Sequence, residues 1–324
     1  MSHDPRVLVG PRIGEDAAAI SMDHRLLVAK SDPITFATEN IGWYAVQVNA
    51  NDIAVMGGEP RWFLATTLLP EGSTARLVES IFTQIESACR SLNISLVGGH
   101  TEVTSGLDRP IVAGFMLGEA LPESLTSSAG AKVGDDIILT RGIAIEGTAA
   151  VALEHGARLE ALGVDPELIH RAGRLLYDPG ISIVKEARVA RHAAPVHAMH
   201  DPTEGGLATG LWEMAQASGL GLEIDLSHVQ VFPETRALCD RLGIDPLGLL
   251  GSGALLIASP QSSRGEILWA LKDEGIPARV IGSMAERDKG FRCIGPGGEH
   301  PLPVFERDEL ARWLDEPGKN NEAP

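Results

Sequence analysis

The sequence predicts an α+β protein of two domains, in which both halves mix strands with helices. The chain has 324 residues, which is long enough for two domains that each bury a core. Aromatic residues make up only 4% of the chain, so the cores depend on Ala, Val, Leu and Ile, which favours helices packed on sheets. The predicted strands near the N-terminus do not alternate regularly with helices, which favours α+β over a doubly wound sheet.

The N-terminal half contains four apolar runs that predict strands, and two helical patterns. The strands are expected at 26–30, 62–69, 94–97 and 111–117. A second helix, with Ser73 as its expected N-cap, has an apolar stripe between 77 and 92. The first helix, 41–55, ends at a Gly-Gly pair and places one carboxylate, Asp52, on the apolar stripe of Ile41, Ala45, Val48 and Val55. Asp52 is the anomaly, because an unpaired charge is costly to bury.

The segment 122–134 is rich in small and polar residues, and we expect the domain boundary there, which gives domains of 1–125 and 126–324. The second half again mixes elements. Its strands are expected at 137–140, 196–200, 254–258 and 278–281. Its helices are expected at 145–153, 167–176, 181–191, 207–214, 234–242 and 262–274.

Charge and composition argue against several classes of partner. The net charge of −17, without a basic stripe, predicts that the chain binds neither nucleic acid nor anionic lipid. No apolar run is long enough to span a membrane, and the opening residues MSHDPRVLVG lack the apolar core of a signal peptide, so we expect a cytoplasmic protein. The three cysteines form no CxxC pair, which argues against a disulfide framework or a Cys₄ zinc site.

The common signatures of nucleotide enzymes and hydrolases are missing from the sequence. It has no GxxxxGK[ST] loop, and neither Gly219-Leu220-Gly221 nor Gly251-Ser252-Gly253 continues to the third glycine of the dinucleotide fingerprint. It also has no HExxH and no GxSxG motif. An acidic protein that binds a phosphorylated ligand needs cations or backbone N–H groups to do so, and Mg²⁺ is the usual cation for nucleotides.

Several carboxylates stand at expected strand and helix ends, where oxygen ligands for Mg²⁺ would be suitable. They are Asp16 in a Glu-Asp pair, Asp32 after a strand, Asp52 on a helix face and Glu102 after a Gly-Gly strand end. Each also has an ordinary structural interpretation. Asp16 would cap a turn, Asp32 would form an Asx-turn before Pro33, and Glu102 would be solvated.

A second group of residues, Asp201 to Gly206, lies between an expected strand and an expected helix. Gly205 and Gly206 would let the backbone approach a ligand closely, and N–H groups at a helix N-terminus favour an anion. On this interpretation, alanine at 206 keeps or raises the melting temperature but lowers turnover. The alternative is a simple N-cap formed by Asp201 or Thr203.

Together these segments resemble the AIR (aminoimidazole ribonucleotide) synthase superfamily. The resemblance covers most of the chain, in the family's order, and is carried by GEDAAAI (14–20), KSDP (30–33), NANDIAVMGGEP (49–60), LVGGHTEV (96–103) and HDPTEGGLATGLWEMA (200–215). It implies PurM-like domains, of which the first dimerises through its sheet into a shared barrel. It also implies that Mg-ATP is used to phosphorylate and activate an amide-type oxygen or another acceptor.

The resemblance also implies roles for individual residues. Asp16, Asp32 and Asp52 would hold Mg²⁺. ATP would contact Asn51, Thr101, Glu102, Thr203, Gly205 and Gly206. His100 and Asp201 would be catalytic, although His100 is equally well explained as a structural replacement for the acidic residue that thiamine-monophosphate kinases have there.

The branch within the superfamily looks closest to HypE, the carbamoyl dehydratase of hydrogenase maturation. HypE modifies a cysteine at its own C-terminus, whereas this sequence ends NNEAP and its last cysteine is Cys293. We therefore expect a homodimeric enzyme that acts on a separate small-molecule or protein acceptor. The alternatives are a maturation component without its own acceptor cysteine, a small-molecule kinase of the thiamine-monophosphate kinase type, and a non-catalytic nucleotide sensor.

Overall fold

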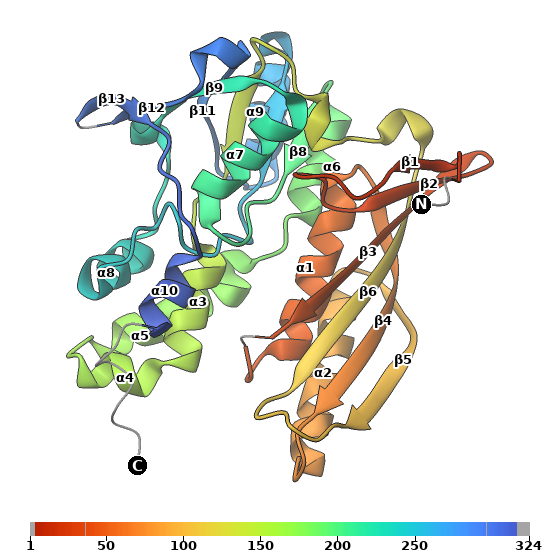
Figure 1. Ribbon diagram of the computed structural model, residues 1–324, viewed down its shortest axis with the longest axis vertical. Helices are drawn as coiled ribbons and strands as arrows, with labels where there is room; N and C mark the ends of the chain where they lie inside the picture. The colour runs from red at the N-terminus through yellow and green to blue at the C-terminus, as the bar shows by residue number, and fades with distance from the viewer. Residues whose placement is uncertain (1–3, 36, 296, 316–324) are drawn as a thin grey trace. The chain divides into compact units, whose positions relative to one another are not determined.

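The computed structural model describes residues 4–35, 37–295 and 297–315, and its chain divides into two compact units, Met1–Leu125 and Thr126–Pro324. The units separate inside the small and polar segment 122–134. Both contain strands and helices (Figure 1), which confirms the predicted α+β class.

The first unit is a six-stranded sheet with two helices. The sheet order is β1-β2-β3-β6-β4-β5, and only the β4–β5 pair is parallel. Helix α1 (Ile41–Val55) packs on β3, β6 and β4, and helix α2 (Ala75–Ser91) packs on α1. The strands are β1 (Val7–Val9), β2 (Ala18–Met22), β3 (Arg25–Ile34), β4 (Glu59–Leu69), β5 (Ser95–Val103) and β6 (Ile111–Ala120).

Residue size explains how closely α1 approaches the sheet. A Cβ on Gly114 of β6 would lie 2.3 Å from Asn49 Nδ2, and one on Gly118 would lie 2.3 Å from Ile53 Cγ2. Because these two positions are glycines, the helix lies directly on the strand, and every residue of α1 except Trp43 is buried. The expected single apolar stripe therefore understated the burial of this helix.

Three local predictions in the first unit are corrected by the structure. The N-cap of α2 is Thr74, whose hydroxyl accepts from Leu77 N–H, whereas the Ser73 hydroxyl donates to the Pro70 carbonyl. Asp32 lies inside β3, because β6 pairs with this strand as far as Ile34. The Gly-Gly-His-Thr-Glu segment likewise continues β5 and is not a loop after it, because β4 pairs with it as far as the residue after Glu102.

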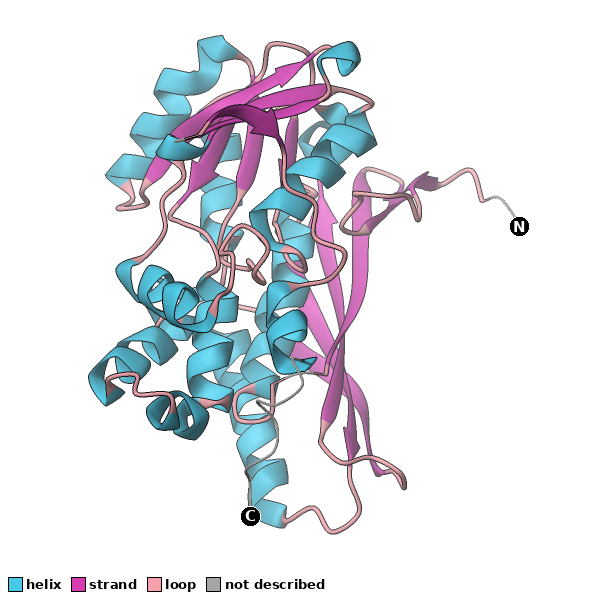
Figure 2. Ribbon diagram, turned by 60° about the vertical axis from the view of Figure 1, so that its left-hand side comes forward, coloured by secondary structure: helices cyan, strands magenta, loops and turns pink. Residues whose placement is uncertain are grey.

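The second unit is a seven-stranded sheet of order β13-β12-β9-β11-β7-β10-β8, with only β9 and β12 parallel. Figure 2 shows helices beside this sheet and a further group of helices below it. The strands are β7 (Asp136–Thr140), β8 (Ala198–His200), β9 (Gly221–Asp225), β10 (Leu256–Ser259), β11 (Ala278–Ala285), β12 (Phe291–Gly295) and β13 (Gly298–Pro301). The helices are α3 (Ile145–Glu154), α4 (Gly156–Ala161), α5 (Pro166–Arg174), α6 (Val184–Ala193), α7 (Gly206–Ser218), α8 (Pro233–Leu242), α9 (Arg264–Asp273) and α10 (Glu309–Asp315).

Candidate functional site

The carboxylates of the first unit gather where α1 lies on β3. Asp52 on α1 is only 3% exposed, and a carboxylate oxygen of Asp16, in the loop before β2, lies within 4.8 Å of an oxygen of Asp52. On β3, Leu26 and Val28 are buried against the helix side, and the two-residue period of the strand places Asp32 on that same side. The three predicted metal ligands therefore come from one helix, one strand and one loop of this unit.

Lys30 is the residue of this site that the sequence analysis missed. Its Nζ lies 3.2 Å from Asp52 Oδ2 and 3.8 Å from Asp32 Oδ2, with its side chain 24% exposed. The ammonium thus supplies positive charge to the buried Asp52 carboxylate and to Asp32. A signal was available, because Lys30 follows the apolar Leu26 and Val28 at two-residue spacing, which places it on the helix-facing side of the strand.

The residue types at this position suit a hard divalent cation. Three carboxylates from separate segments provide the oxygen ligands that Mg²⁺ prefers, and Lys30 shows that the cluster attracts a cation. Two asparagines of α1 are buried. Asn49 Nδ2 donates to the carbonyls of Ala45 at 2.8 Å and Asp32 at 3.2 Å, which ties the helix to the strand, and Asn51 is fully buried on α1.

His100, Thr101 and Glu102 are not brought to this cluster within one chain. They lie on the edge strand β5, three strands away from β3 in the sheet, or about 14 Å at the usual strand spacing. The register pairs His100 with Thr66, which is exposed between the buried Ala65 and Thr67, so His100 lies on the sheet face away from α1. There His100 Nε2 is 3.2 Å from Glu102 Oε2.

In the second unit, the Asp201–Gly206 loop joins β8 to α7 with Asp201 almost fully buried. Gly205 and Gly206 have φ angles of 74° and 61°, in the left-handed region that favours glycine. The N–H of Gly205 donates to Asp308 Oδ2 at 2.8 Å, and the N–H of Gly206 donates to the Thr203 carbonyl at 3.0 Å. The loop is therefore held in its conformation by contacts within this unit.

Two expectations about this loop are wrong. The N–H groups of Gly205, Gly206 and Ala208 already have acceptors inside the unit, so the start of α7 does not present them free to an anion. Alanine at 206 would not preserve stability, because its Cβ would lie 2.6 Å from the Leu249 carbonyl oxygen and 2.7 Å from that of Leu247, at a left-handed φ.

Glu146 and Asp308 are ionisable residues near this loop that the sequence analysis missed. Burial raises the pKa of Glu146, in the first turn of α3, to about 8, although hydrogen bonds with Ser252 oppose the shift. Burial likewise raises the pKa of Asp308 to about 6, against the N–H groups of Gly205 and Leu310 that bond to its carboxylate. At neutral pH the Glu146 carboxyl therefore keeps its proton.

The three cysteines of the sequence are buried in the structure. Burial raises the pKa of Cys89 to about 11, of Cys239 to about 12 and of Cys293 to about 11. Because the thiolate is the reactive form of cysteine, none of these side chains is suited to accept a group from a bound ligand at neutral pH.

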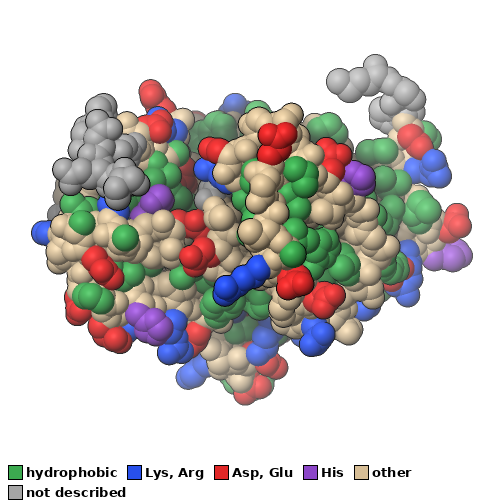
Figure 3. Space-filling model, turned by 90° about the horizontal axis from the view of Figure 1, so that it is seen from below, with side chains coloured by type: hydrophobic (Ala, Val, Ile, Leu, Met, Phe, Trp, Pro, Cys, Tyr) green, Lys and Arg blue, Asp and Glu red, His purple; other side chains and the backbone are tan. Residues whose placement is uncertain are grey.

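On the face drawn in Figure 3, basic side chains are scattered among acidic ones and gather into no broad patch. Among the described helices, none combines the length and the apolar character that crossing a bilayer requires.

Comparison with known proteins places this geometry in a family. Residues 14–120 match the N-terminal domain, and residues 132–293 the C-terminal domain, of AIR synthase related proteins. The chain is 30% identical to the carbamoyl dehydratase HypE of Azotobacter vinelandii over 291 residues, which cover 86% of this chain and 80% of the relative.

Solved structures give the same result. The crystal structure of Escherichia coli HypE, a hydrogenase maturation protein, has a TM-score of 0.75 and 27% identity, with 89% of this chain and 88% of that chain covered. A HypE in complex with ATP has the same fold, with a TM-score of 0.71 at 24% identity and coverage of 95% and 92%. The chain belongs to the family of AIR synthase related proteins, near HypE.

Proposed function

We propose that this protein is an ATP-dependent enzyme of the HypE-like type, which uses Mg-ATP to phosphorylate and activate an amide-type oxygen or another acceptor. The observation that carries the proposal is the cluster of Asp16, Asp32, Asp52 and Lys30 between α1 and β3. Its relatives named above are a carbamoyl dehydratase and a HypE in complex with ATP, which supports a nucleotide as the ligand.

Asp16, Asp32 and Asp52 would hold the magnesium ion. Bound there, Mg²⁺ would offset the negative charge of the phosphates during phosphoryl transfer. The Lys30 ammonium lies 3.2 Å from the buried Asp52 carboxylate and supplies a counter-charge there. Asn51, Thr101, Glu102, Thr203, Gly205 and Gly206 remain proposed nucleotide contacts, and His100 and Asp201 remain proposed catalytic residues.

The acceptor in this proposal is a separate molecule, either a small amide-type compound or a partner protein. The three cysteines are buried with raised pKa values, so none serves as an acceptor of the kind that self-modification needs. A maturation component without its own acceptor cysteine is compatible with this proposal, and ADP release would distinguish an enzyme from a nucleotide sensor. A cytoplasmic location is also part of the proposal.

The direct test replaces the two aspartates that contact Lys30. Asp52→Asn and Asp32→Asn each remove one charged oxygen ligand, and Mg-ATP affinity measured by calorimetry should fall by about tenfold or more. Asp23→Asn, in the exposed turn between β2 and β3, is the matched control and should bind as the wild type does. If both site variants keep wild-type affinity, this assignment of the metal site is wrong.

We further propose that the first unit forms a homodimer through its sheet. One sheet face carries α1 and α2, whereas the other carries apolar side chains that are at most partly buried, with Trp62 36% and Phe115 41% exposed. Such a face is usually covered in the working protein. Its apolar residues are Leu27, Ala29, Trp62, Leu64, Ala113, Phe115 and Leu117.

Light scattering should therefore report twice the chain mass of 34.3 kDa. Trp62→Glu, which places a charge in the middle of that face, should shift the protein toward the single-chain mass. A wild-type protein that stays at the single-chain mass at every concentration would exclude the homodimer.

A further inference from the structure

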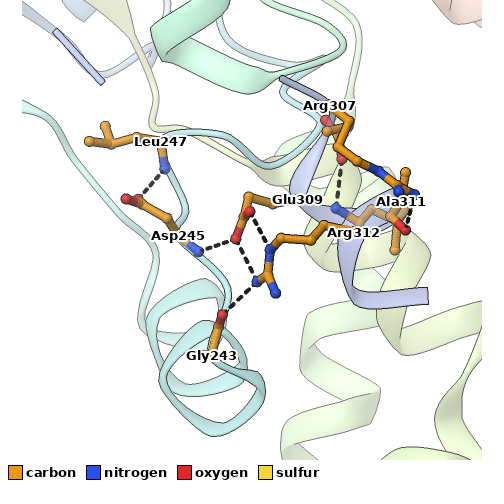
Figure 4. A network of polar contacts seen from close by, with 9 residues as sticks. Gly243, Asp245, Leu247, Arg307, Glu309, Ala311 and Arg312 are labelled. Carbon is orange, nitrogen blue, oxygen red and sulfur yellow. Dashed lines mark hydrogen bonds and ion pairs between the residues drawn. The ribbon is translucent and has the colours of Figure 1, made fainter. Parts of the chain in front are cut away.

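The C-terminal part of the second unit, residues 305–313, packs along the segment 243–249. Figure 4 shows the polar contacts: Glu309 Oε2 accepts from the N–H of Asp245 at 2.9 Å, and Arg312 donates to the Gly243 carbonyl at 2.7 Å and to both oxygens of Glu309. The Glu309 N–H also donates to the Gly248 carbonyl at 3.0 Å. These contacts attach the start of α10 to a segment that lies 60 or more residues earlier in the chain.

Contacts of aromatic rings hold the same segment at both of its ends. A Cβ on Gly248 would lie 2.5 Å from the ring of Phe305, so the absence of a side chain at 248 lets that ring lie on the backbone. Trp313 is fully buried, with its ring 5.4 Å from that of His155 and 3.9 Å from the guanidinium of Arg158. The segment 305–313 is thereby fixed on both sides of Asp308.

Asp308 lies between these anchors and reaches the Asp201–Gly206 loop. Its Oδ2 accepts from the N–H of Gly205 at 2.8 Å, and its Oδ1 accepts from the N–H of Leu310 at 2.8 Å. Gly205 is the N-cap of α7 and has no side chain, and its own N–H is bound by a carboxylate from 103 residues away. One side chain therefore caps α10 and sets the backbone of the glycine loop.

The charges around Asp308 make this bond sensitive to its surroundings. Glu204 and Glu309 raise the pKa of Asp308 in addition to burial, and Asp308 in turn raises that of Glu146. The N–H groups of Gly205 and Leu310 oppose these effects, and Arg312 is engaged with Glu309. The Gly205 N–H thus contributes directly to stabilising the ionised form of Asp308.

We propose that Asp308 is a positioning residue, which holds the Thr203–Gly206 loop in the conformation that the bound nucleotide requires. The inference rests on the proposed function, because that loop is its proposed nucleotide contact. Gly205 and Gly206 have left-handed φ angles that the loop would not keep by local preference alone, since glycine is also the residue with the most alternative conformations. A fixed acceptor at Asp308 removes those alternatives.

The test compares two helix-capping aspartates of the same unit. Asp308→Asn keeps one carbonyl oxygen for two N–H donors, whereas Asp165→Asn alters the N-cap of α5, where Asp165 Oδ1 accepts from Glu167 N–H at 3.1 Å. In full-length protein, Asp308→Asn should speed hydrogen exchange in a peptide spanning 203–207 by about tenfold and weaken a non-hydrolysable Mg-ATP analogue by about tenfold. Asp165→Asn should change neither. Asp308→Glu, which keeps a carboxylate, should recover part of both effects.

The possible outcomes distinguish a failure of the inference about Asp308 from a failure of the proposed function. Unchanged exchange in Asp308→Asn overturns the inference, because the loop would then hold its conformation without the carboxylate. If Asp308→Asn exchanges faster but binds the nucleotide analogue as tightly as Asp165→Asn does, Asp308 is only a helix cap. That result also overturns the inference. If wild-type protein does not bind the analogue at all, the proposed function fails, and so does the role of Asp308 in nucleotide binding, even where the exchange result stands.

Discussion

The two units bury carboxyl groups in opposite ways. In the first unit, Asp52 is 3% exposed and lies 3.2 Å from the Lys30 ammonium. In the second, Glu146 is 1% exposed, no Lys or Arg contributes to its pKa, and its Oε2 has no hydrogen-bond partner within the described residues. A nearby cation favours the charged form of a buried carboxyl group, whereas burial without one favours the protonated form.

This difference assigns different chemistry to the two sites. Carboxylate oxygens are the ligands that a hard divalent cation prefers, so the group at Asp52 is suited to hold Mg²⁺. A carboxyl that keeps its proton at neutral pH offers a hydrogen-bond donor and little negative charge, which suits Glu146 to the neighbourhood of a loop proposed to contact an anionic ligand. Similar residues in similar burial thus suit a proposed metal site in one unit and a neutral carboxyl group in the other.

The largest expected effect is a pH-dependent gain of stability in Glu146→Gln. The pKa of Glu146 is about 8 in the folded protein and near 4.5 in the unfolded chain. Between these two pH values the unfolded chain releases the proton and the folded protein does not. The wild type therefore loses stability as the pH rises from about 4.5 to 8. Glutamine has no proton to release. The variant should nearly equal the wild type near pH 4.5 and exceed it by about 4 kcal/mol at pH 8. Urea unfolding at the two pH values measures this.

Glu309→Gln is the matched control for that prediction. Glu309 is also buried but is bonded through both oxygens to Arg312, at 2.6 and 2.8 Å, so removing its charge should lower stability at pH 8 instead of raising it. A Glu146→Gln variant that loses stability equally at both pH values would show that Glu146 is ionised, and the contrast between the units would not hold.

A smaller effect is expected for Lys30→Met in the first unit. Removing the ammonium leaves the carboxylates of Asp52 and Asp32 without that counter-charge and should cost about 2 kcal/mol, since Lys30 is partly exposed and solvent screens part of the interaction. Magnesium should restore the lost stability by binding the same oxygens. The rise in melting temperature on adding Mg²⁺ should therefore be larger in the variant than in the wild type.

Lys185→Met provides the comparison for Lys30. Lys185 is 48% exposed and pairs with the equally exposed Glu274 at 2.9 Å, so its removal should have little effect on stability and none on the response to Mg²⁺. Equal responses to Mg²⁺ in the wild type and in both lysine variants would mean that the carboxylates at Lys30 do not bind the ion.

Much of the secondary structure was predictable, because it depends on local patterns. Most expected strands and helices appear within a few residues of their predicted ends, as α3, α8 and β7 show. The elements that were missed are short and carry little periodic signal, such as β12 and β13, or were set aside as loops, such as the end of β5. In β5, pairing with β4 extends the strand through two glycines that by themselves favour a turn.

Some features of this protein follow from the sequence by itself. The fold class, the family and the unusual Asp52 on an apolar helix are properties of residue order, since periodicity and motifs are read along one segment at a time. The grouping of Asp16, Asp32 and Asp52 was implied by the resemblance, and the structure brings Asp16 and Asp52 close together and links Asp52 and Asp32 through Lys30.

Other features were decided only by the tertiary structure. The strand register placed Lys30 beside Asp52 and turned His100 to the opposite sheet face, and the packing of residues 305–313 brought Asp308 to Gly205. The left-handed φ of Gly206 and the carbonyls of Leu247 and Leu249 around it arise in the same way. The physical reason is that charge pairing, capping and burial depend on distances between segments far apart in the chain, which no local pattern specifies.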